Sequence, residues 1–165
     1  MQTIINKLEQ TSEISGRLVS WLTLLIVILT FIVVILRYAL DIGSIAMQES
    51  ITYFHAFVFM LGAAYTLKHD SHVRVDIFYR NMTPVKKAWV DLLGTLFLLF
   101  PVCLFIFFSS WEYVLTSWSQ FEESGEAGGL AYVYILKTAL LIMPILLMFQ
   151  GTALALKNLL LIKTH

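Results

Sequence analysis

The sequence predicts an all-α integral membrane protein with four transmembrane helices and an interfacial amphipathic arm between the second and the third. The 165 residues are 59% hydrophobic and 13% charged, whereas a soluble domain has about 25% charged residues. The apolar residues gather in four long stretches, and a helix needs about 20 such residues to cross a hydrocarbon core of about 30 Å. The segments between these stretches are alternately rich and poor in basic residues, which is typical of a chain that crosses a membrane repeatedly.

The expected spans lie at about residues 18–36, 51–67, 89–111 and 130–156. The first has no charged residue. The third begins at Trp89 and ends at Trp111, about 33 Å apart along a helix, which suits one aromatic residue at each interface. Pro101 and Pro144 are expected to kink the third and fourth spans, because each removes a backbone hydrogen bond. We expect residues 1–165 to form a single membrane domain.

Small residues predict where helices approach one another closely, since membrane interfaces favour them. They occur in the second and fourth spans as Ala56, Gly62, Ala63, Ala64, Gly151, Ala153 and Ala155. The first span is mostly Leu, Ile, Val and Phe, which suits lipid or a broad apolar partner surface. The one cysteine, Cys103, is expected to pack as a small apolar residue.

The basic residues predict the orientation, because Lys and Arg are retained on the cytoplasmic side. Basic residues occur in the N-terminal segment, the second loop and the C-terminal segment, whereas the first loop has only Arg37 and the third has none. Both termini and the second loop are therefore expected in the cytoplasm. The third loop is acidic and is expected outside, as is the first.

The second loop has more pattern than topology requires. An interfacial arm is expected at about residues 72–83. After Asp76, Ile77 and Phe78 occur among basic residues, which suits a short amphipathic helix in the membrane interface that also attracts anionic lipid headgroups. Asp76 is a candidate N-cap for this arm. Thr83 is expected to cap the third span, with Pro84 at its first helical position.

Four motifs are distinctive. The most specific is "GAAYTLKHDSHVRVDIFY", which begins at Gly62. The others are "RYALD" from Arg37, "QES" around Glu49 and "LKTALLIMPILLMFQG" from Leu136. Together they resemble the small membrane subunit of tripartite ATP-independent periplasmic (TRAP) transporters, the DctQ-like family. "GLAYVY" stands where one subgroup of the family often has a proline and a tryptophan, so the resemblance leaves the substrate open.

The resemblance implies a division of labour. A separate large membrane subunit would hold the substrate and sodium sites, a periplasmic protein would capture the substrate, and this chain would brace the large subunit in a bacterial inner membrane. The chain would then be no enzyme. No catalytic site, substrate contact, metal, cofactor or nucleic-acid partner is expected in it.

Charged residues near the ends of the spans are the candidate contacts. The set expected to organise the arm and the contact with the large subunit is Arg37, Glu49, His72, Arg74 and Asp76. Glu122, Glu123 and Glu126 of the third loop are expected to help dock the periplasmic protein. The alternatives are that Arg37 and Glu49 only extend toward the interface, that the arm serves topology alone, and that the acidic loop is merely solvated.

Two other classes of function stay open. A self-sufficient homodimeric exporter would need an essential acid within the membrane, whereas Glu49 and Glu112 lie near the ends of spans. A haem-binding electron-transfer subunit would need a second axial ligand facing His55, which is the one histidine within a span. His55 is more simply interpreted as neutral and hydrogen-bonded to another helix or to a partner.

Overall fold

The computed structural model describes residues 2–72 and 76–164, and the part described is helices and short connections. The elements are α1 (Gln2–Ala39), α2 (Ile45–Lys68), α3 (Asp76–Tyr79), α4 (Pro84–Gly94), the π-helical η1 (Thr95–Leu99), α5 (Phe100–Ser119) and α6 (Val133–Thr164). Because α4, η1 and α5 follow one another without a break, four helical runs are long and apolar enough to cross a membrane. The predicted fold class, all-α with four spans, is confirmed.

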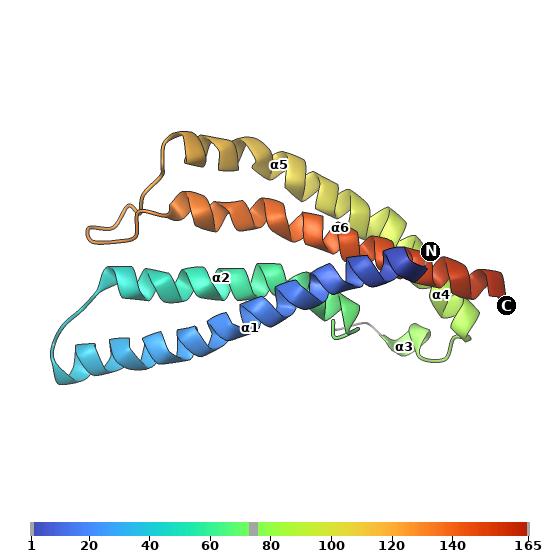
Figure 1. The fold of residues 1–165 in the computed structure, drawn as a ribbon, viewed down its shortest axis with the longest axis horizontal. Coiled ribbons are helices and arrows are strands. Elements are labelled where there is room, and N and C mark those ends of the chain that lie inside the picture. Colours follow the sequence, from blue (N-terminus) through green and yellow to red (C-terminus); the bar gives the residue numbers. More distant parts are fainter. Residues whose placement is uncertain (1, 73–75, 165) are drawn as a thin grey trace.

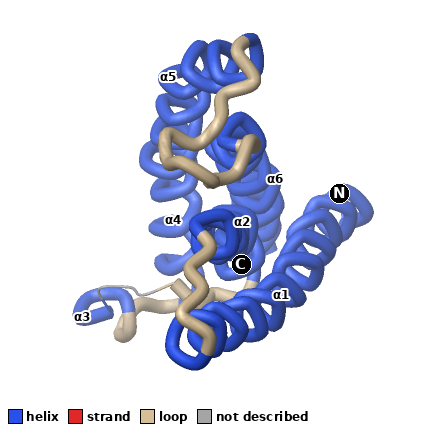
Figure 2. Tube along the Cα trace, turned by 90° about the vertical axis from the view of Figure 1, so that its left-hand side faces the viewer, coloured by secondary structure: helices blue, strands red, loops and turns tan. Residues whose placement is uncertain are grey.

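The four runs form an open row toward the end of the molecule that holds residues 40–44 and 120–132, where Figure 1 shows the order α1, α2, α6, α5. Toward the other end, α1 crosses α2 and also contacts α6 (Figures 1 and 2). The helix α6 contacts α1, α2, α4, η1 and α5, so it is the centre of the packing. Both chain termini and α3 lie at one end, which we call the terminal end. The opposite end, which we call the loop end, holds residues 40–44 and 120–132.

The helix α1 is much longer than its apolar part. It begins at Gln2 rather than near residue 18, and its 38 residues rise about 57 Å, nearly twice the thickness of a hydrocarbon core. The additional turns are amphipathic, and Ile5 and Ser12 are fully buried. At Gly16 the helix meets α2 so closely that an added Cβ would lie 2.3 Å from the Tyr65 ring.

The third run begins as the sequence predicts. Thr83 is the N-cap of α4, its hydroxyl accepts a hydrogen bond from the Lys86 N–H at 3.5 Å, and Pro84 follows in the first turn. The irregularity expected at Pro101 takes the form of η1, in which the Phe100 N–H donates to the Thr95 carbonyl. A π turn of this kind is one of the few recognised ways to accommodate a disturbed hydrogen-bond ladder inside a helix.

The small residues of α6 lie where neighbouring helices touch it. Ala139, Gly151 and Ala153 are buried, and Pro144 is buried inside the helix. A Cβ on Gly151 would lie 2.7 Å from the Leu99 side chain and 2.9 Å from the Phe100 ring. Gly151 therefore sets the distance between α6 and the third run, as its residue type predicts.

The regular part of the arm is shorter than expected. The arm was predicted over residues 72–83, with a short amphipathic helix following Asp76 as its N-cap, whereas α3 has only four residues and starts at Asp76 itself. The apolar side chains Ile77 and Phe78 are exposed, whereas the Tyr79 hydroxyl donates to Asp91 Oδ2 of α4 at 2.7 Å. Lys87 Nζ lies 5.2 Å from the centre of the Tyr79 ring. The arm is thus attached to the start of the third run, and its location in a membrane interface stays a prediction.

Candidate partner interface

At the terminal end, one carboxylate joins α1 to the end of α2. Glu13 Oε2 accepts a hydrogen bond from Lys68 Nζ at 2.6 Å and lies 3.2 Å from His69 Nε2. Its other oxygen accepts from Arg17 Nε at 3.0 Å. One turn earlier, Glu9 pairs with Lys157 of α6. The amphipathic start of α1 is therefore fastened to both α2 and α6.

Neither glutamate is among the contact residues predicted from the sequence. Glu9, Glu13 and Arg17 follow one another at intervals of four, which puts them on one face of a helix. That spacing is a signal that the segment is helical and that the face is paired. The partners Lys68 and Lys157 lie far away in the sequence, so no local pattern identifies them.

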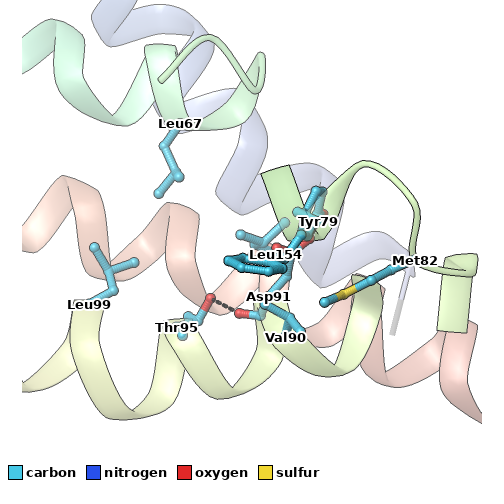
Figure 3. A pocket seen from close by; sticks show the side chains of 10 residues that line it. Leu67, Tyr79, Met82, Val90, Asp91, Thr95, Leu99 and Leu154 are labelled. Atoms are coloured by element: carbon cyan, nitrogen blue, oxygen red, sulfur yellow. Dashed lines mark hydrogen bonds between the residues drawn. The ribbon is translucent and has the colours of Figure 1, made fainter. Parts of the chain in front are cut away.

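A groove of about 420 Å³ opens beside the arm at the same end (Figure 3). Its walls come from α2, α3, α4, η1 and α6, with Leu67, Leu99 and Leu154 among the apolar lining residues. Asp91 is its charged residue; its carboxylate accepts from Tyr79, and its backbone carbonyl accepts from Thr95 Oγ1 at 2.7 Å. A mostly apolar hollow of this size suits an acyl chain or an apolar side chain of a partner.

At the loop end, Glu49 holds the third loop. Its carboxylate accepts hydrogen bonds from the Leu130 N–H at 2.6 Å and from the Ser124 hydroxyl. The backbone of Gly129 passes so close that an added Cβ would lie 2.5 Å from Ser124 Oγ and 2.9 Å from Glu49 Oε1. Glu49 therefore fixes the return of the loop toward α6.

A second ion pair joins the loop to α6 directly. Glu122 pairs with Lys137, whose ammonium lies 3.9 Å from the centre of the Tyr113 ring of α5. The Lys137 side chain is only 13% exposed. The hydrogen bond from Lys137 keeps the pKa of the Glu122 carboxyl below its usual range. Residues 120–132 are thus anchored at two points.

The structure distributes the predicted contact residues over both ends. Arg37 is exposed at the loop end and borders a cavity of about 480 Å³ with Asp41 and Gln48. It makes no ion pair within the described part of the chain, and Glu49 binds the third loop rather than Arg37.

Three further predicted residues, His72, Glu123 and Glu126, are exposed. His72 is exposed in a bend at the terminal end. Arg74 falls outside the described residues, and of Asp76 only the backbone position at the start of α3 is described. Glu123 and Glu126 are exposed on the third loop, whereas Glu122 is engaged by Lys137. The contact of these residues with partners stays a prediction.

Metal chemistry finds no support in these sites. Over residues 2–72 and 76–164, no group of three or more His, Cys, Asp or Glu side chains is placed to hold a metal ion. Glu9, Glu13, Glu49 and Glu122 instead bind other parts of the same chain.

The family described as "Tripartite ATP-independent periplasmic transporters, DctQ component" matches residues 26–160. The match begins inside α1 and ends inside α6, so it includes part or all of each of the four spans. Comparisons with curated proteins and with solved structures give no match. Since the family match extends over most of the chain, this multi-pass membrane protein belongs to the DctQ component family of TRAP transporters.

Proposed function

We propose that the chain is the small scaffold subunit of a sodium-coupled TRAP uptake transporter. It braces a separate large membrane subunit, which holds the substrate and sodium sites, and it performs no catalysis itself. The observation that most supports this role is the open row of four helices fastened at both ends. A row presents two broad sides to other molecules, whereas a closed bundle would direct its packing inward.

The ion pairs and hydrogen bonds at both ends suit a subunit that keeps its shape while the large subunit moves. Glu13 and Glu9 tie α1 to α2 and α6 at the terminal end. Glu49 and Lys137 tie the third loop at the loop end. Relative sliding of the helices would break charge-assisted bonds at both ends at once, and such bonds are among the stronger ones in proteins.

The third loop also supports a role in receiving the periplasmic binding protein. Glu123 and Glu126 are exposed on a segment whose two ends are anchored. Fixed negative charges steer a basic patch on a partner and raise its association rate. This role requires the loop end to face the periplasm, with both termini in the cytoplasm of a bacterial inner membrane.

Co-purification tests the scaffold role. The chain, tagged at its C-terminus, is extracted mildly from its native membrane, and its partners are identified by mass spectrometry. We expect one large multi-spanning subunit in a fixed ratio to the chain. A homo-oligomer alone, under conditions that preserve other complexes, would favour the exporter, and a haem absorbance band would favour the electron-transfer subunit.

Charge neutralisation tests the docking role. The double variant Glu123→Gln/Glu126→Gln should lower the association rate of the binding protein and weaken its dependence on salt. The matched control, Asp41→Asn/Glu112→Gln, removes the same charge from exposed acids outside the third loop. Equal rates for the two double variants would rule out a specific role of the loop.

A further inference from the structure

One face of α2 is exposed although it is partly polar. Gln48, Thr52, His55 and Phe59 follow one another at intervals of four, three and four, which places them on one side of the helix. All four are exposed, and Phe59 is 77% exposed. We call these four residues the α2 stripe.

His55 is the member of the stripe that lipid cannot satisfy. It lies about 15 Å along the helix axis from Ile45 and about 20 Å from Lys68, near the middle of a helix long enough to cross the hydrocarbon core. An imidazole has both a donor and an acceptor to satisfy, and His55 makes no hydrogen bond or ion pair within the part of the chain that the structure describes. Thr52, by contrast, donates to the Gln48 carbonyl of its own helix at 3.3 Å.

The exposed faces of α1 and α5 carry mainly apolar side chains rather than an unpaired polar group. In α1 the large exposed residues of the apolar part include Val27, Phe31 and Val34, and in α5 they include Phe105 and Phe108. Such side chains are satisfied by lipid. Polar groups in membrane helices, in contrast, usually face other protein or a water-filled space.

Gly62, one turn beyond the stripe, is a second observation that favours a neighbouring helix. It follows Phe59 and is half-buried at the edge of the stripe that borders α1, where a Cβ would meet only Val19 Cγ2, at an ordinary 3.8 Å. Packing within the chain therefore does not require a glycine there, unlike at Gly16 and Gly151. A helix from another chain that crosses closely at this point would require it.

We infer that the α2 stripe, with Gly62, is the seam on which a transmembrane helix of the large subunit packs, and that this helix supplies a hydrogen-bond partner to His55. The inference rests on the proposed scaffold function. Lipid chains offer no donor or acceptor, so the occupant is protein. The large subunit is favoured over a second copy because the family description makes this chain one component of a tripartite transporter.

Site-specific crosslinking tests where the partner lies. The photoreactive residue p-benzoylphenylalanine is placed at position 52 or 59 and, as matched controls on apolar faces, at position 31 of α1 or 105 of α5. We expect crosslinks to the large subunit from positions 52 and 59, at least several-fold stronger than from the controls. Crosslinks mainly to a second copy, or stronger crosslinks from position 105 than from 59, would overturn the inference.

Variants test the hydrogen bond and the close approach. His55→Leu should reduce the large subunit retained on purification by about three- to tenfold, as expected for one interhelical hydrogen bond in a membrane. His55→Asn, which keeps a donor and an acceptor, should retain more of it, and Gly62→Ala, whose added Cβ fits within the chain, should lose at least as much as His55→Leu. Wild-type retention by both His55→Leu and Gly62→Ala would contradict the seam.

Two controls distinguish failure of the proposed seam from failure of the proposed scaffold function. His55 is exposed, and a Cβ at Gly62 would meet Val19 at an ordinary distance, so the thermal unfolding of the isolated His55→Leu and Gly62→Ala variants should match that of the wild type. Loss of the large subunit from the wild type itself would instead contradict the scaffold function. A stable wild-type complex without crosslinks at positions 52 and 59 would contradict the seam alone.

Discussion

At Gly16 the backbone of α1 lies against the ring of Tyr65 on α2. An added Cβ would lie 2.3 Å from two ring carbons and 2.6 Å from Tyr65 Cβ, and the ring cannot move away without moving its own Cβ. Gly94 is a helical glycine in the opposite situation, because nothing lies within 4 Å of its Cβ position. The two residues therefore form a matched pair for testing close packing.

We expect Gly16→Ala to lower the free energy of unfolding by about 1–3 kcal/mol, as overpacking does. Gly94→Ala should leave it unchanged or raise it by up to about 1 kcal/mol, because alanine favours a helix. Cys103 is the only cysteine and is 1% exposed, so its reaction with a fluorogenic thiol reagent during heating reports unfolding. Equal unfolding temperatures for the two variants would contradict the close contact.

The ion pair between Glu122 and Lys137 makes stability depend on pH. Because the pKa of Glu122 is lowered in the folded state, its contribution is present above the usual glutamate pKa of about 4.3 and is lost as the pH falls through the lowered value. We therefore expect Glu122→Gln to be less stable than the wild type at pH 7 and closer to it in acid. Glu123→Gln, on the exposed side of the same loop, should show no such convergence in the same assay.

At the scale of elements, hydropathy predicted much of the fold. The four apolar stretches, the cap at Thr83 and the close packing at Gly151 all follow from signals within one helix or one turn. The start of α1 could not be predicted in this way, because Glu9 and Glu13 find their partners on α6 and α2. The hydrogen bonds of Glu49 could not be predicted either, because its carboxylate accepts from a backbone N–H 81 residues away.

The start of α1 is expected to depend on Glu13. Glu13→Gln removes the charge that Lys68, Arg17 and His69 share, so hydrogen exchange over residues 2–16 should become faster while exchange in α6 stays slow. The charge-exchanged double variant Glu13→Lys/Lys68→Glu should restore part of the protection. If exchange over residues 2–16 is equally slow in Glu13→Gln, the contacts of Ile5 and Ser12 alone hold this segment.

At the scale of the whole molecule, the contacts at the terminal end and those at the loop end form two separate sets. Glu49 and Lys68 are about 28 Å apart along α2, and their hydrogen-bonding partners are different. Distant sites without shared partners usually make additive contributions to stability. Figure 1 shows the two ends joined by the lengths of α2 and α6.

We therefore predict that substitutions at the two ends have additive effects on stability. The loss of unfolding free energy in Glu13→Gln/Glu49→Gln should equal the sum of the losses in the single variants to within about 0.5 kcal/mol. Thermal unfolding reported by Cys103 measures all three. A double variant much less stable than the sum would mean that the helices transmit changes from one end to the other.

The open row also has a consequence for biosynthesis. The chain consists of two helical hairpins, α1 with α2 and the third run with α6, and residues 69–83 are their covalent link. The hairpins also meet through the contacts of α6 with α1 and α2 and through the pair of Glu9 and Lys157. Two polypeptides that divide the chain between Lys68 and Pro84 should therefore insert separately and reassemble in the membrane, so that one gene could be replaced by two.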